Sequence, residues 1–596
     1  SMVDTALVPC SNLEPAAEMA GKRAALEMLA HYGVYKDVPR VDSKHLKRIR
    51  ARWEPQHRGG DEIKWRFVAQ EFKWMEIRDD VFAASSSAQL SRLVDFVSIK
   101  EDGHATAIAD CVKAYYQAEQ TEQVCVEPPA EYLALLHELG RPTDIVWKLE
   151  RMLPGQRAAG AGWVDTAARK LVEVGYERCE ALPQFFRHPD TKVLAEMHMD
   201  DFHLEGPVEA LGGALVEMRK LFDLKASDVI TTGRYSHLKR ERLRLDSGDV
   251  LIRAPPKYID SVVELLGMEK AKTAKTPSLM EEDDGESPAL DLASVEKFRS
   301  SVGILLYINV DRDDIQRDVQ LLSRCLKEPT EFDWRRLVRL VRYLKGNRCL
   351  GVVLKRPKHG KAGVVVMDQY SDTDFATCKT TRRAMTCGRV HLDDVPFHSF
   401  ARRQGVQTTS SGEAEFYGAT SVVMDGRIIK VALEWLGYKV IYRLHVDSSA
   451  AKAMMNREGV GKLKHMDVRA LWIQAERKHH GLQVLKIPGD RNPADLGTKA
   501  HPEGRFKQLL RLIGMVDCSK VDEFEELGAY AIEVAASTSV GSSQMRSALA
   551  AVLLSQMPVQ GAASEIHDGE KTVSMISLLM VMTTLAVLMG AFWYGH

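Results

Sequence analysis

The acidic residues that could do chemistry in this 596-residue chain stand where strand-like segments end. The apolar run from Val193 to Met199 leads directly into Asp200 and Asp201, and another run, Ala105 to Ala109, is followed by Asp110. Neighbouring carboxylates repel unless solvent or a hard divalent cation neutralises them, and Mg²⁺ prefers carboxylates together with phosphate oxygens. A one-residue step along a strand reverses the side-chain face, so Asp200 and Asp201 cannot be equal ligands unless the turn rotates them. A solvated surface turn is the alternative for this pair.

A second set of acids follows a similar pattern between residues 371 and 496. Strand-like segments lead to Asp372 and Asp447, and helical segments begin around Glu415 and Asp495. Each acid alone fits a helix cap or a solvated turn, because carboxylates are favoured in the first turn of a helix. Together, in the order Asp, Glu, Asp, Asp, they are hard to dismiss as caps and predict a second carboxylate site.

The elements that must position these acids indicate an α+β chain. Strand-like runs are interleaved with helical periodicity at 165–174 and 207–222. Residues 276–290 are acidic and poor in apolar residues, so we expect a linker that does not pack. Segment 334–344 predicts a helix with an apolar inner stripe and outward cations. From 363 to 515 strands and helices alternate, which is typical of a compact α/β domain.

Bulk composition limits the alternatives. At 596 residues the chain is too long for one hydrophobic core. Lys+Arg 81 nearly balance Asp+Glu 82, so the net charge neither indicates nor excludes a nucleic-acid partner. The 9 cysteines form no Cys-x-x-Cys pair, which indicates neither a zinc ribbon nor a disulfide framework and favours an intracellular protein.

The C-terminal segment 573–594 is apolar and uncharged. As a helix it would span ~33 Å, which is enough for a bilayer. We therefore expect a hydrophobic helix there that anchors the chain to a membrane. A buried core helix, or sequence that was never selected, is the alternative.

Two segments resemble the catalytic motifs of copia-type reverse transcriptases. Asp110 with Tyr115 five residues later resembles the first motif, in which an aromatic residue excludes the ribose 2′-hydroxyl. The segment 198–201, His-Met-Asp-Asp, resembles the aromatic-x-Asp-Asp hairpin of that family. The resemblance implies that Asp110 and Asp200 bridge two Mg²⁺ or Mn²⁺ ions while Asp201 supports them, as a primer 3′-hydroxyl attacks the α-phosphate of a dNTP.

Two more segments resemble the nucleotide-contacting parts of the same family. The segment 64–69 resembles the fingers motif whose basic residues meet the triphosphate. The segment 155–163 resembles the stretch Gly-Leu-Lys-Gln-Ala-Pro-Arg-Ala-Trp under the incoming nucleotide, although Ala158 stands at the family's Gln and Gly160 at its Pro. By this resemblance the nucleotide-binding residues are Lys64, Arg66, Tyr115 and Gly155.

The later acids, with their flanking residues, resemble copia-type ribonuclease H. That resemblance implies catalytic and metal-binding roles for Asp372, Glu415, Asp447 and Asp495, and makes Asp374 and Glu413 bystanders. The implied reaction is hydrolysis of the RNA strand of an RNA:DNA hybrid with two divalent ions. The segment 464–469, Lys-His-Met-Asp-Val-Arg, resembles the family's Lys-His-Ile-Asp-Ile-Arg, so His465 would assist proton transfer or product release. A structural or solvated histidine is the alternative.

Residues 297–346 look like the copia-type connection region, whose cationic helix face would hold the hybrid by phosphate contacts. The residues expected to make those contacts are Arg335, Arg339, Arg342 and Lys345. The expected fold is α+β and multidomain, with a fingers, palm and thumb-like unit, a helical connection and an α/β ribonuclease H-like domain. The expected boundaries are 1–40 for an N-terminal extension, 41–275 for the reverse transcriptase, 276–290 for the linker, 291–360 for the connection, 361–515 for the ribonuclease H-like domain, 516–570 for a low-complexity tail and 571–596 for the transmembrane helix.

The resemblance leaves three hypotheses. The first is an active polymerase and nuclease acting on an RNA template, a DNA primer and RNA:DNA hybrids. The second is a catalytically decayed remnant that still binds nucleic acid, which the change at Ala158 suggests. The third is a membrane-tethered host protein that uses the old fold as a scaffold, which segment 573–594 alone suggests.

Overall fold

The computed structural model describes residues 15–57, 63–72, 90–281, 285–357, 362–376, 381–459 and 471–519. The chain divides into two units, and these residues all fall in the first, Ser1–Ala536. His465 and the expected membrane anchor at 573–594 lie outside the described residues. Within the described part, no helix has both the length and the apolar character needed to cross a bilayer.

The first part of the chain builds a small mixed sheet in the order β1-β7-β6-β2 and a separate hairpin, β3-β4. Its core is aromatic, because the Tyr35 ring stacks on Trp147 and Phe67 meets the same indole edge-on. The elements are α1 (Pro15–His31), β1 (Tyr35–Pro39), η2 (Arg40–Ser43), β2 (Lys47–Ile49), β3 (Ala51–His57), β4 (Ile63–Ala69), β6 (Val124–Val126), α4 (Ala130–Glu138) and β7 (Ile145–Leu149).

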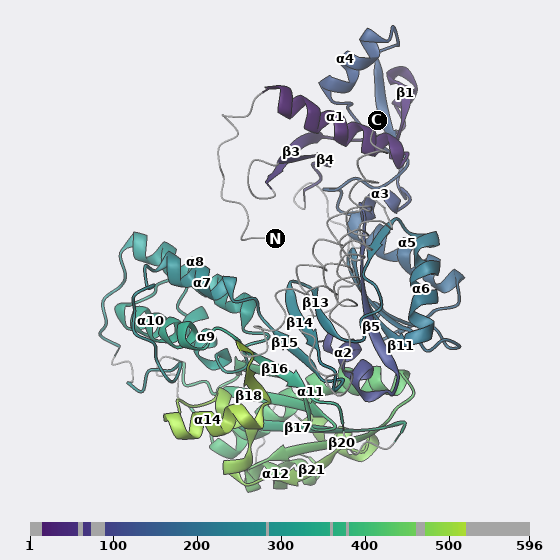
Figure 1. Cartoon of the computed structure of the whole chain (residues 1–596). Helices are drawn as coiled ribbons and strands as arrows, with labels where there is room; N and C mark the ends of the chain where they lie inside the picture. Colours follow the sequence, from purple (N-terminus) through teal and green to yellow (C-terminus); the bar gives the residue numbers. More distant parts are fainter. Residues whose placement is uncertain are drawn as a thin grey trace, which may run out of the picture. The chain divides into compact units, whose positions relative to one another are not determined.

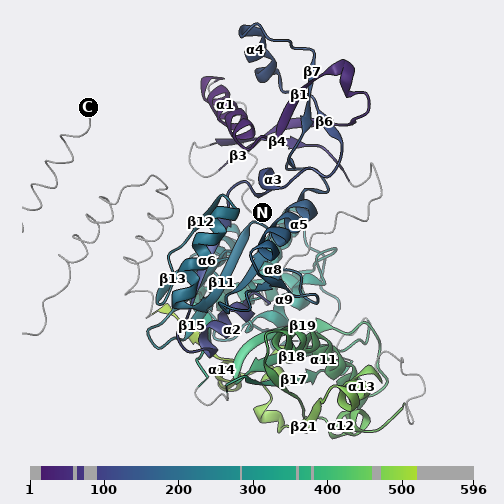
Figure 2. The ribbon, with the colours of Figure 1, turned by 90° about the vertical axis from the view of Figure 1, so that its right-hand side faces the viewer.

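The next sheet has six strands in the order β12-β5-β11-β10-β9-β8. Helices α5 and α6 cover one of its faces, where Trp163, Leu171 and Leu211 pack on Phe202 and Leu204 (Figures 1 and 2). The elements are α2 (Arg92–Lys100), β5 (His104–Cys111), α3 (Ala114–Gln117), α5 (Ala159–Glu173), β8 (Glu177–Arg178), β9 (Phe185–Arg187), β10 (Leu194–His198), β11 (Asp201–Pro207), α6 (Val208–Leu221) and β12 (Leu224–Ala226).

A third sheet joins segments that are far apart in the sequence, in the order β13-β14-β15-β16-β22. In the described chain, helices α7 to α10 lie between β15 and β16, and the last of them, α10, begins at a capping box formed by Thr330 and Asp333. The elements are β13 (Gly233–His237), β14 (Arg240–Arg244), β15 (Val250–Arg253), α7 (Lys257–Leu265), α8 (Leu292–Ile308), α9 (Gln316–Ser323), α10 (Glu331–Gly346), β16 (Leu350–Leu354) and β22 (Met515–Asp517).

The fourth sheet has the order β19-β18-β17-β20-β21, with β17 antiparallel to β18 and parallel to β20. Helix α11 packs on this sheet through Phe416, Ala419 and Val423. The elements are β17 (Val364–Thr373), β18 (Met385–Leu392), β19 (Val395–Arg403), α11 (Ser411–Trp435), β20 (Lys439–Val446), α12 (Ser449–Asn456), α13 (Trp472–His479), β21 (Gln483–Lys486), η4 (Gly489–Arg491), η5 (Pro493–Gly497) and α14 (Glu503–Leu512).

The α+β class is as expected, and so is the inner stripe of α10, since Leu337, Leu340, Val341 and Leu344 are buried. The expectation that 276–290 does not pack is wrong at its start. Thr276, Pro277 and Ser278 are buried, and the Ser278 hydroxyl donates to Asp318 Oδ2 at 2.8 Å. Their small side chains fit against α9 and α10, which the acidic composition of the later residues does not reveal.

Candidate active sites

The first acidic site forms where β5 and β11 run side by side. The two strands are antiparallel, and Asp201 lies opposite Asp110 in their register. The turn before β11 places Met199 at a φ of 56°, and the Trp163 indole donates to the Met199 carbonyl at 2.7 Å. The Cys111 amide donates to the Asp200 carbonyl at 2.8 Å. These two bonds fix the turn, so the acids of two distant segments meet in a defined arrangement.

A cavity of about 320 Å³ opens at this point. Its lining comes from five separate regions of the chain and brings cations and carboxylates together. The lining residues are Lys64, Arg66, Asp110, Cys111, Val112, Lys113, Ala114, Tyr115, Tyr116, Pro154, Trp163, Met199, Asp200 and Lys225. Asp110, Asp200, Lys64, Arg66 and Tyr115 were all predicted to share a site, and the structure brings them together.

Asp200 and Asp201 are unequal, as the strand geometry predicted. Asp200 lines the cavity, whereas Asp201 faces Asp110 across the strands and is absent from the lining among the described residues. Burial, and then the charges of Asp200 and Asp110, raise the pKa of Asp201 to about 7. Asp201 therefore sits where a second full negative charge is costly.

The electrostatics of this site call for a cation. Partial burial and the charge of Asp200 raise the pKa of Asp110, while Lys225, its neighbour on β12, opposes that rise. Burial and Asp200 also raise the pKa of the Tyr115 hydroxyl, against the nearby Arg66. Carboxylates that resist ionisation because they face each other are the donor set that a hard divalent ion stabilises.

The loop that resembles the family's nucleotide-contacting segment is built differently from the expectation. Gly155 is absent from the described lining of the cavity, and the adjacent Pro154 lines it instead. Gly155 has a φ of +88°, and a Cβ there would lie 2.1 Å from the Ala69 carbonyl oxygen. The residue is thus required where two backbones approach each other, and its expected contact with a nucleotide stays a prediction.

The second acidic site gathers at the end of β17 and the start of α11. Asp372, Glu415 and Asp447 each offer a carboxylate oxygen, and these oxygens all lie within 4.8 Å of one another. Asp447 directly follows β20, the parallel neighbour of β17. Ser410 caps α11 by accepting the Glu413 amide, which sets the first turn that carries Glu415.

Burial dominates the electrostatics of this cluster. Burial, followed by the charges of Asp372 and Asp447, raises the pKa of Glu415 to about 9. Burial also raises the pKa of Asp372 to about 6, although Lys499 and a hydrogen bond from Thr498 act in the opposite direction. Among the described residues, Glu415 Oε2 is buried without a hydrogen-bond partner. An orphaned carboxylate oxygen that faces two further acids fits a bound divalent cation.

Asp495, the fourth predicted acid, is placed beside this cluster and is engaged by cations. Lys499 Nζ lies 2.9 Å from Asp495 Oδ1 and 3.8 Å from Asp372 Oδ2. Arg505 Nη2 lies 3.0 Å from Asp495 Oδ2. Although burial opposes it, the hydrogen bonds from these two cations lower the pKa of Asp495. Asp374, which was predicted to be a bystander, accepts a hydrogen bond from the Met385 amide at 2.5 Å.

The cationic residues expected to hold nucleic acid on α10 have protein partners. Arg339 donates to the Thr276 carbonyl at 3.0 Å and to its hydroxyl at 2.8 Å. Arg342 donates to the Lys272 carbonyl at 2.6 Å, and Lys345 to the Ala271 carbonyl at 2.9 Å. Arg335 pairs with Glu281 at 3.4 Å near the surface. These residues therefore fasten segment 271–281 to α10, and contact with nucleic acid stays a prediction.

Sequence reasoning missed the cations that balance both sites. Lys225 faces Asp110 only because β12 pairs with β5, and nothing in the local sequence predicts that pairing. Lys499 follows Asp495 by four residues, so helical spacing could have indicated that pair. Its second contact, with Asp372, depends on tertiary structure.

Comparison with known proteins gives the following matches. No protein-family model matches the chain. The retrovirus-related Pol polyprotein from transposon TNT 1-94 of Nicotiana tabacum is 26% identical over 421 residues, which cover 68% of this chain and 30% of that protein. The Pol polyprotein from transposon RE1 of Arabidopsis thaliana is 25% identical over 68% of this chain and 27% of its own length. The chain thus spans less than a third of these relatives.

Solved structures give weaker matches. A foamy viral protease-reverse transcriptase in complex with an RNA/DNA hybrid is 9% identical and has a TM-score of 0.45, with 80% of this chain and 54% of that one covered. The ribonuclease LC11-RNase H1 is 17% identical and has a TM-score of 0.18, with 23% of this chain and 93% of that one covered. The sequence relatives confirm the resemblance that the motifs indicated: across 68% of its residues, the chain is a homologue of the copia-type, retrovirus-related Pol polyproteins of transposons.

Proposed function

We propose that the chain is an RNA-directed DNA polymerase with ribonuclease H activity, from a copia-type retrotransposon. The observation that carries the proposal is that carboxylates from distant segments converge twice. Asp110 and Asp200 meet in a cavity that also contains Lys64 and Arg66. Asp372, Glu415 and Asp447 converge in a separate cluster. Homology to Pol polyproteins supports the assignment of both sites.

In the polymerase site, Asp110 and Asp200 would hold Mg²⁺ or Mn²⁺, two ions per site. When bound, such ions stabilise the attacking and leaving oxygens of an in-line phosphoryl transfer. Lys64 and Arg66 lie in the same cavity as the acids, where they can neutralise a dNTP triphosphate. Tyr115 also lines that cavity, where its ring can exclude a ribose 2′-hydroxyl. Asp201 supports the pair from the adjacent strand position.

In the nuclease site, Asp372, Glu415 and Asp447 would hold the metal ions, with Asp495 alongside. The orphaned Oε2 of Glu415 fits a cation better than it fits a solvated surface acid. Lys499 lies between Asp372 and Asp495, where it opposes the rise in the pKa of Asp372 and helps to lower that of Asp495. The proposed substrate is the RNA strand of an RNA:DNA hybrid, and His465, which lies outside the described residues, would assist proton transfer.

Two matched variants test the proposal by separating the activities. Asp110→Asn should abolish primer extension on an RNA template and leave hybrid cleavage intact. Asp372→Asn should do the reverse. Each variant is the folding control for the other, since each retains one activity. If the parent chain gives no Mg²⁺-dependent product in either assay, the proposal is wrong.

One observation favours a second candidate, a decayed remnant that binds nucleic acid without polymerising. Ala158 stands where the family has a glutamine, is only 5% exposed, and offers no amide to a nucleotide. The nearest glutamine, Gln156, is buried, and its Oε1 accepts from the Leu153 amide at 2.6 Å and from Gln120 at 3.2 Å. Salt-sensitive binding of an RNA:DNA hybrid with no turnover would select this alternative.

A further inference from the structure

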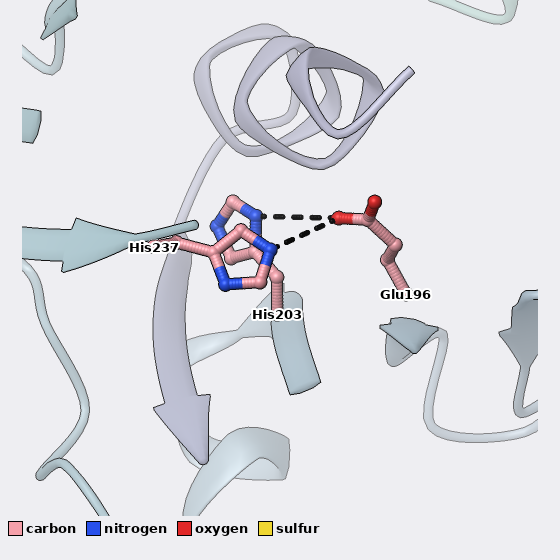
Figure 3. Close-up of side chains that lie close together, drawn as sticks. All are labelled: Glu196, His203 and His237. Carbon is pink, nitrogen blue, oxygen red and sulfur yellow. Dashed lines mark ion pairs between the residues drawn. The ribbon is translucent and has the colours of Figure 1, made fainter. Parts of the chain in front are cut away.

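Three titratable side chains cluster behind the Asp200–Asp201 turn, outside both acidic sites. Glu196 lies on β10, His203 on β11 and His237 at the end of β13. Their side chains are 0% exposed. Figure 3 shows both imidazole rings next to each other, with a nitrogen of each directed at one oxygen of the Glu196 carboxylate.

The fold places these residues together from two sheets. Glu196 and His203 are direct partners in the antiparallel register of β10 and β11, so their side chains share one face. His237 comes from the separate β13-β14-β15 sheet, and its ring centroid lies 4.8 Å from that of His203. The cluster therefore spans the contact between the sheet that carries Asp110 and the sheet beside it.

The hydrogen bonds around His203 determine which of its nitrogens carries the proton. The Thr106 hydroxyl donates its one hydrogen to the Leu204 carbonyl at 2.7 Å. Its oxygen, 3.0 Å from His203 Nε2, must therefore accept from Nε2–H. In the neutral ring Nδ1 is then a lone pair, and it faces Glu196 Oε2 at 3.8 Å. Two lone pairs directed at each other in a dry interior call for a cation between them.

The separations match a metal site better than a hydrogen-bonded network. Glu196 Oε2 lies 3.5 Å from His237 Nε2 and 3.8 Å from His203 Nδ1, both longer than a good hydrogen bond. Tetrahedral Zn²⁺ with ligands at about 2.05 Å separates them by about 3.4 Å. One ligand atom from each residue lies within 4.8 Å of the other two. Within the described chain, neither ring nitrogen of His237 makes a hydrogen bond.

The surroundings supply the outer partners that a metal-bound histidine needs. Asp95 Oδ1 lies 3.6 Å from His203 Nε2, on the ring edge away from Glu196. Arg242 holds Asp95 at 3.0 Å, and the Tyr235 hydroxyl donates to the same carboxylate at 3.0 Å. A carboxylate behind a histidine fixes the tautomer and makes the facing nitrogen a better ligand. Burial lowers the pKa of both His203 and His237, which keeps the rings neutral, as ligation requires.

We propose that Glu196, His203 and His237 bind one Zn²⁺ ion. Two imidazole nitrogens and a carboxylate are ligands that this ion accepts, and the second oxygen of Glu196 or a water would complete four-coordination. Full burial makes the role structural. The ion would link the β10-β11 hairpin, whose turn holds Asp200 and Asp201, to β13. The site contains no cysteine, and its two histidines are far apart in sequence, so no metal-binding sequence motif indicates it.

The test is the metal content of the full-length chain produced with added zinc and purified in excess Mg²⁺, which occupies the acidic sites. We expect one Zn²⁺ per chain in the parent protein, and less than a tenth of that in Glu196→Gln and in His237→Gln. His391→Gln is the matched control, since His391 is also a buried histidine but lies outside the cluster. It should retain the zinc.

X-ray absorption at the zinc edge of the parent chain gives a second readout that needs no variant. Two imidazoles around the ion are expected. A parent chain without zinc, zinc that survives Glu196→Gln, or a spectrum without imidazole scattering would each overturn the proposal. None of these results bears on primer extension or hybrid cleavage, so the test fails or succeeds separately from the proposed function.

Discussion

Replacing Glu415 with Gln should stabilise the metal-free protein while it abolishes hybrid cleavage. The pKa of Glu415 is raised from 4.5 to about 9 in the folded chain, because burial and two neighbouring acids disfavour its charge. A carboxyl with a raised pKa does not reduce the free energy of unfolding below about pH 4.5, because it is protonated in both the folded and the unfolded chain. As the pH rises toward 9, Glu415 stays protonated in the folded chain but loses its proton in the unfolded chain. The free energy of unfolding therefore falls steadily over this pH range.

The size of this loss of stability follows from the pH range between 4.5 and about 9. Each pH unit above 4.5 costs about 1.4 kcal/mol while Glu415 stays protonated, or about 4 kcal/mol at pH 7.5. The pKa of Asp372 in the same cluster is also raised, so the proton is shared and we take about half, ~2 kcal/mol, as the expected gain. Glutamine has nearly the same shape and no charge. In a chelator at pH 7.5 the melting temperature of Glu415→Gln should exceed that of the parent by about 4 °C or more, and the difference should vanish near pH 4.

The assay is thermal unfolding at several pH values, with and without Mg²⁺. Added Mg²⁺ should stabilise the parent more than Glu415→Gln, because the variant lacks one anionic ligand. Glu413→Gln is the matched control, since Glu413 is on the same helix turn and instead accepts from the Thr409 amide at 2.8 Å. The control should lose stability and keep the Mg²⁺ response. If Glu415→Gln melts below the parent in the chelator at pH 7.5, the reasoning about this carboxylate fails.

Three further predictions rest on single contacts. Gly155→Ala should cost about 3 kcal/mol of stability in denaturant unfolding, because its Cβ would lie 2.1 Å from the Ala69 oxygen and the residue has a φ of +88°. The control Gly140→Ala should cost about 1 kcal/mol, because Gly140 has a φ of +65° but open space around it. Arg339→Ala should cost about 1–3 kcal/mol in the same assay through the loss of two hydrogen bonds to Thr276. The control Arg335→Ala should change stability by less than about 0.5 kcal/mol, because Arg335 is exposed in its ion pair with Glu281. Lys499→Met should move the acidic limb of the cleavage pH profile to higher pH, because Lys499 lowers the pKa of Asp372 and Asp495; an unmoved limb would show that this lysine does not tune the acids.

The parts of the sites that could be predicted from sequence are those determined by residues adjacent in the chain. The apolar runs that end at Asp110 and Asp200 read directly as strands that deliver an acid, and the structure forms β5 and β10 there. The one-residue step that separates the faces of Asp200 and Asp201 follows from strand geometry alone. The acids Asp372, Glu415 and Asp447 were predicted to share a site because their order and flanking residues resemble copia-type ribonuclease H, and the structure brings their carboxylates together.

What could not be predicted depends on neighbours from other segments. The packing of Thr276 and Ser278 requires α9 and α10 to be in place, and the acidic residues that follow give the opposite impression. Arg339 lies on the outer face of a helical wheel, but the returning segment 271–281 contacts it. The histidines at 203 and 237 have no spacing that indicates a shared site, because β11 and β13 belong to different sheets.

In both acidic sites burial makes the charged carboxylates costly to the folded chain, and a nearby lysine limits that cost in each. Glu415 is only 9% exposed and Asp201 is half-buried, so both carboxylates are kept from water and their charged forms are disfavoured. A lysine lies beside the acids of each cluster, Lys225 at one and Lys499 at the other, and each opposes the rise in pKa of a neighbouring aspartate. Further cations lie nearby, because Lys64, Arg66 and Lys113 line the first cavity and Arg505 pairs with Asp495 at the second site. Even with these cations present, burial and neighbouring acids raise the pKa of Asp201 and Glu415, so ionising the carboxylates still costs free energy. A divalent ion bound between the acids would offset that cost directly, and a metal-dependent reaction therefore suits both clusters.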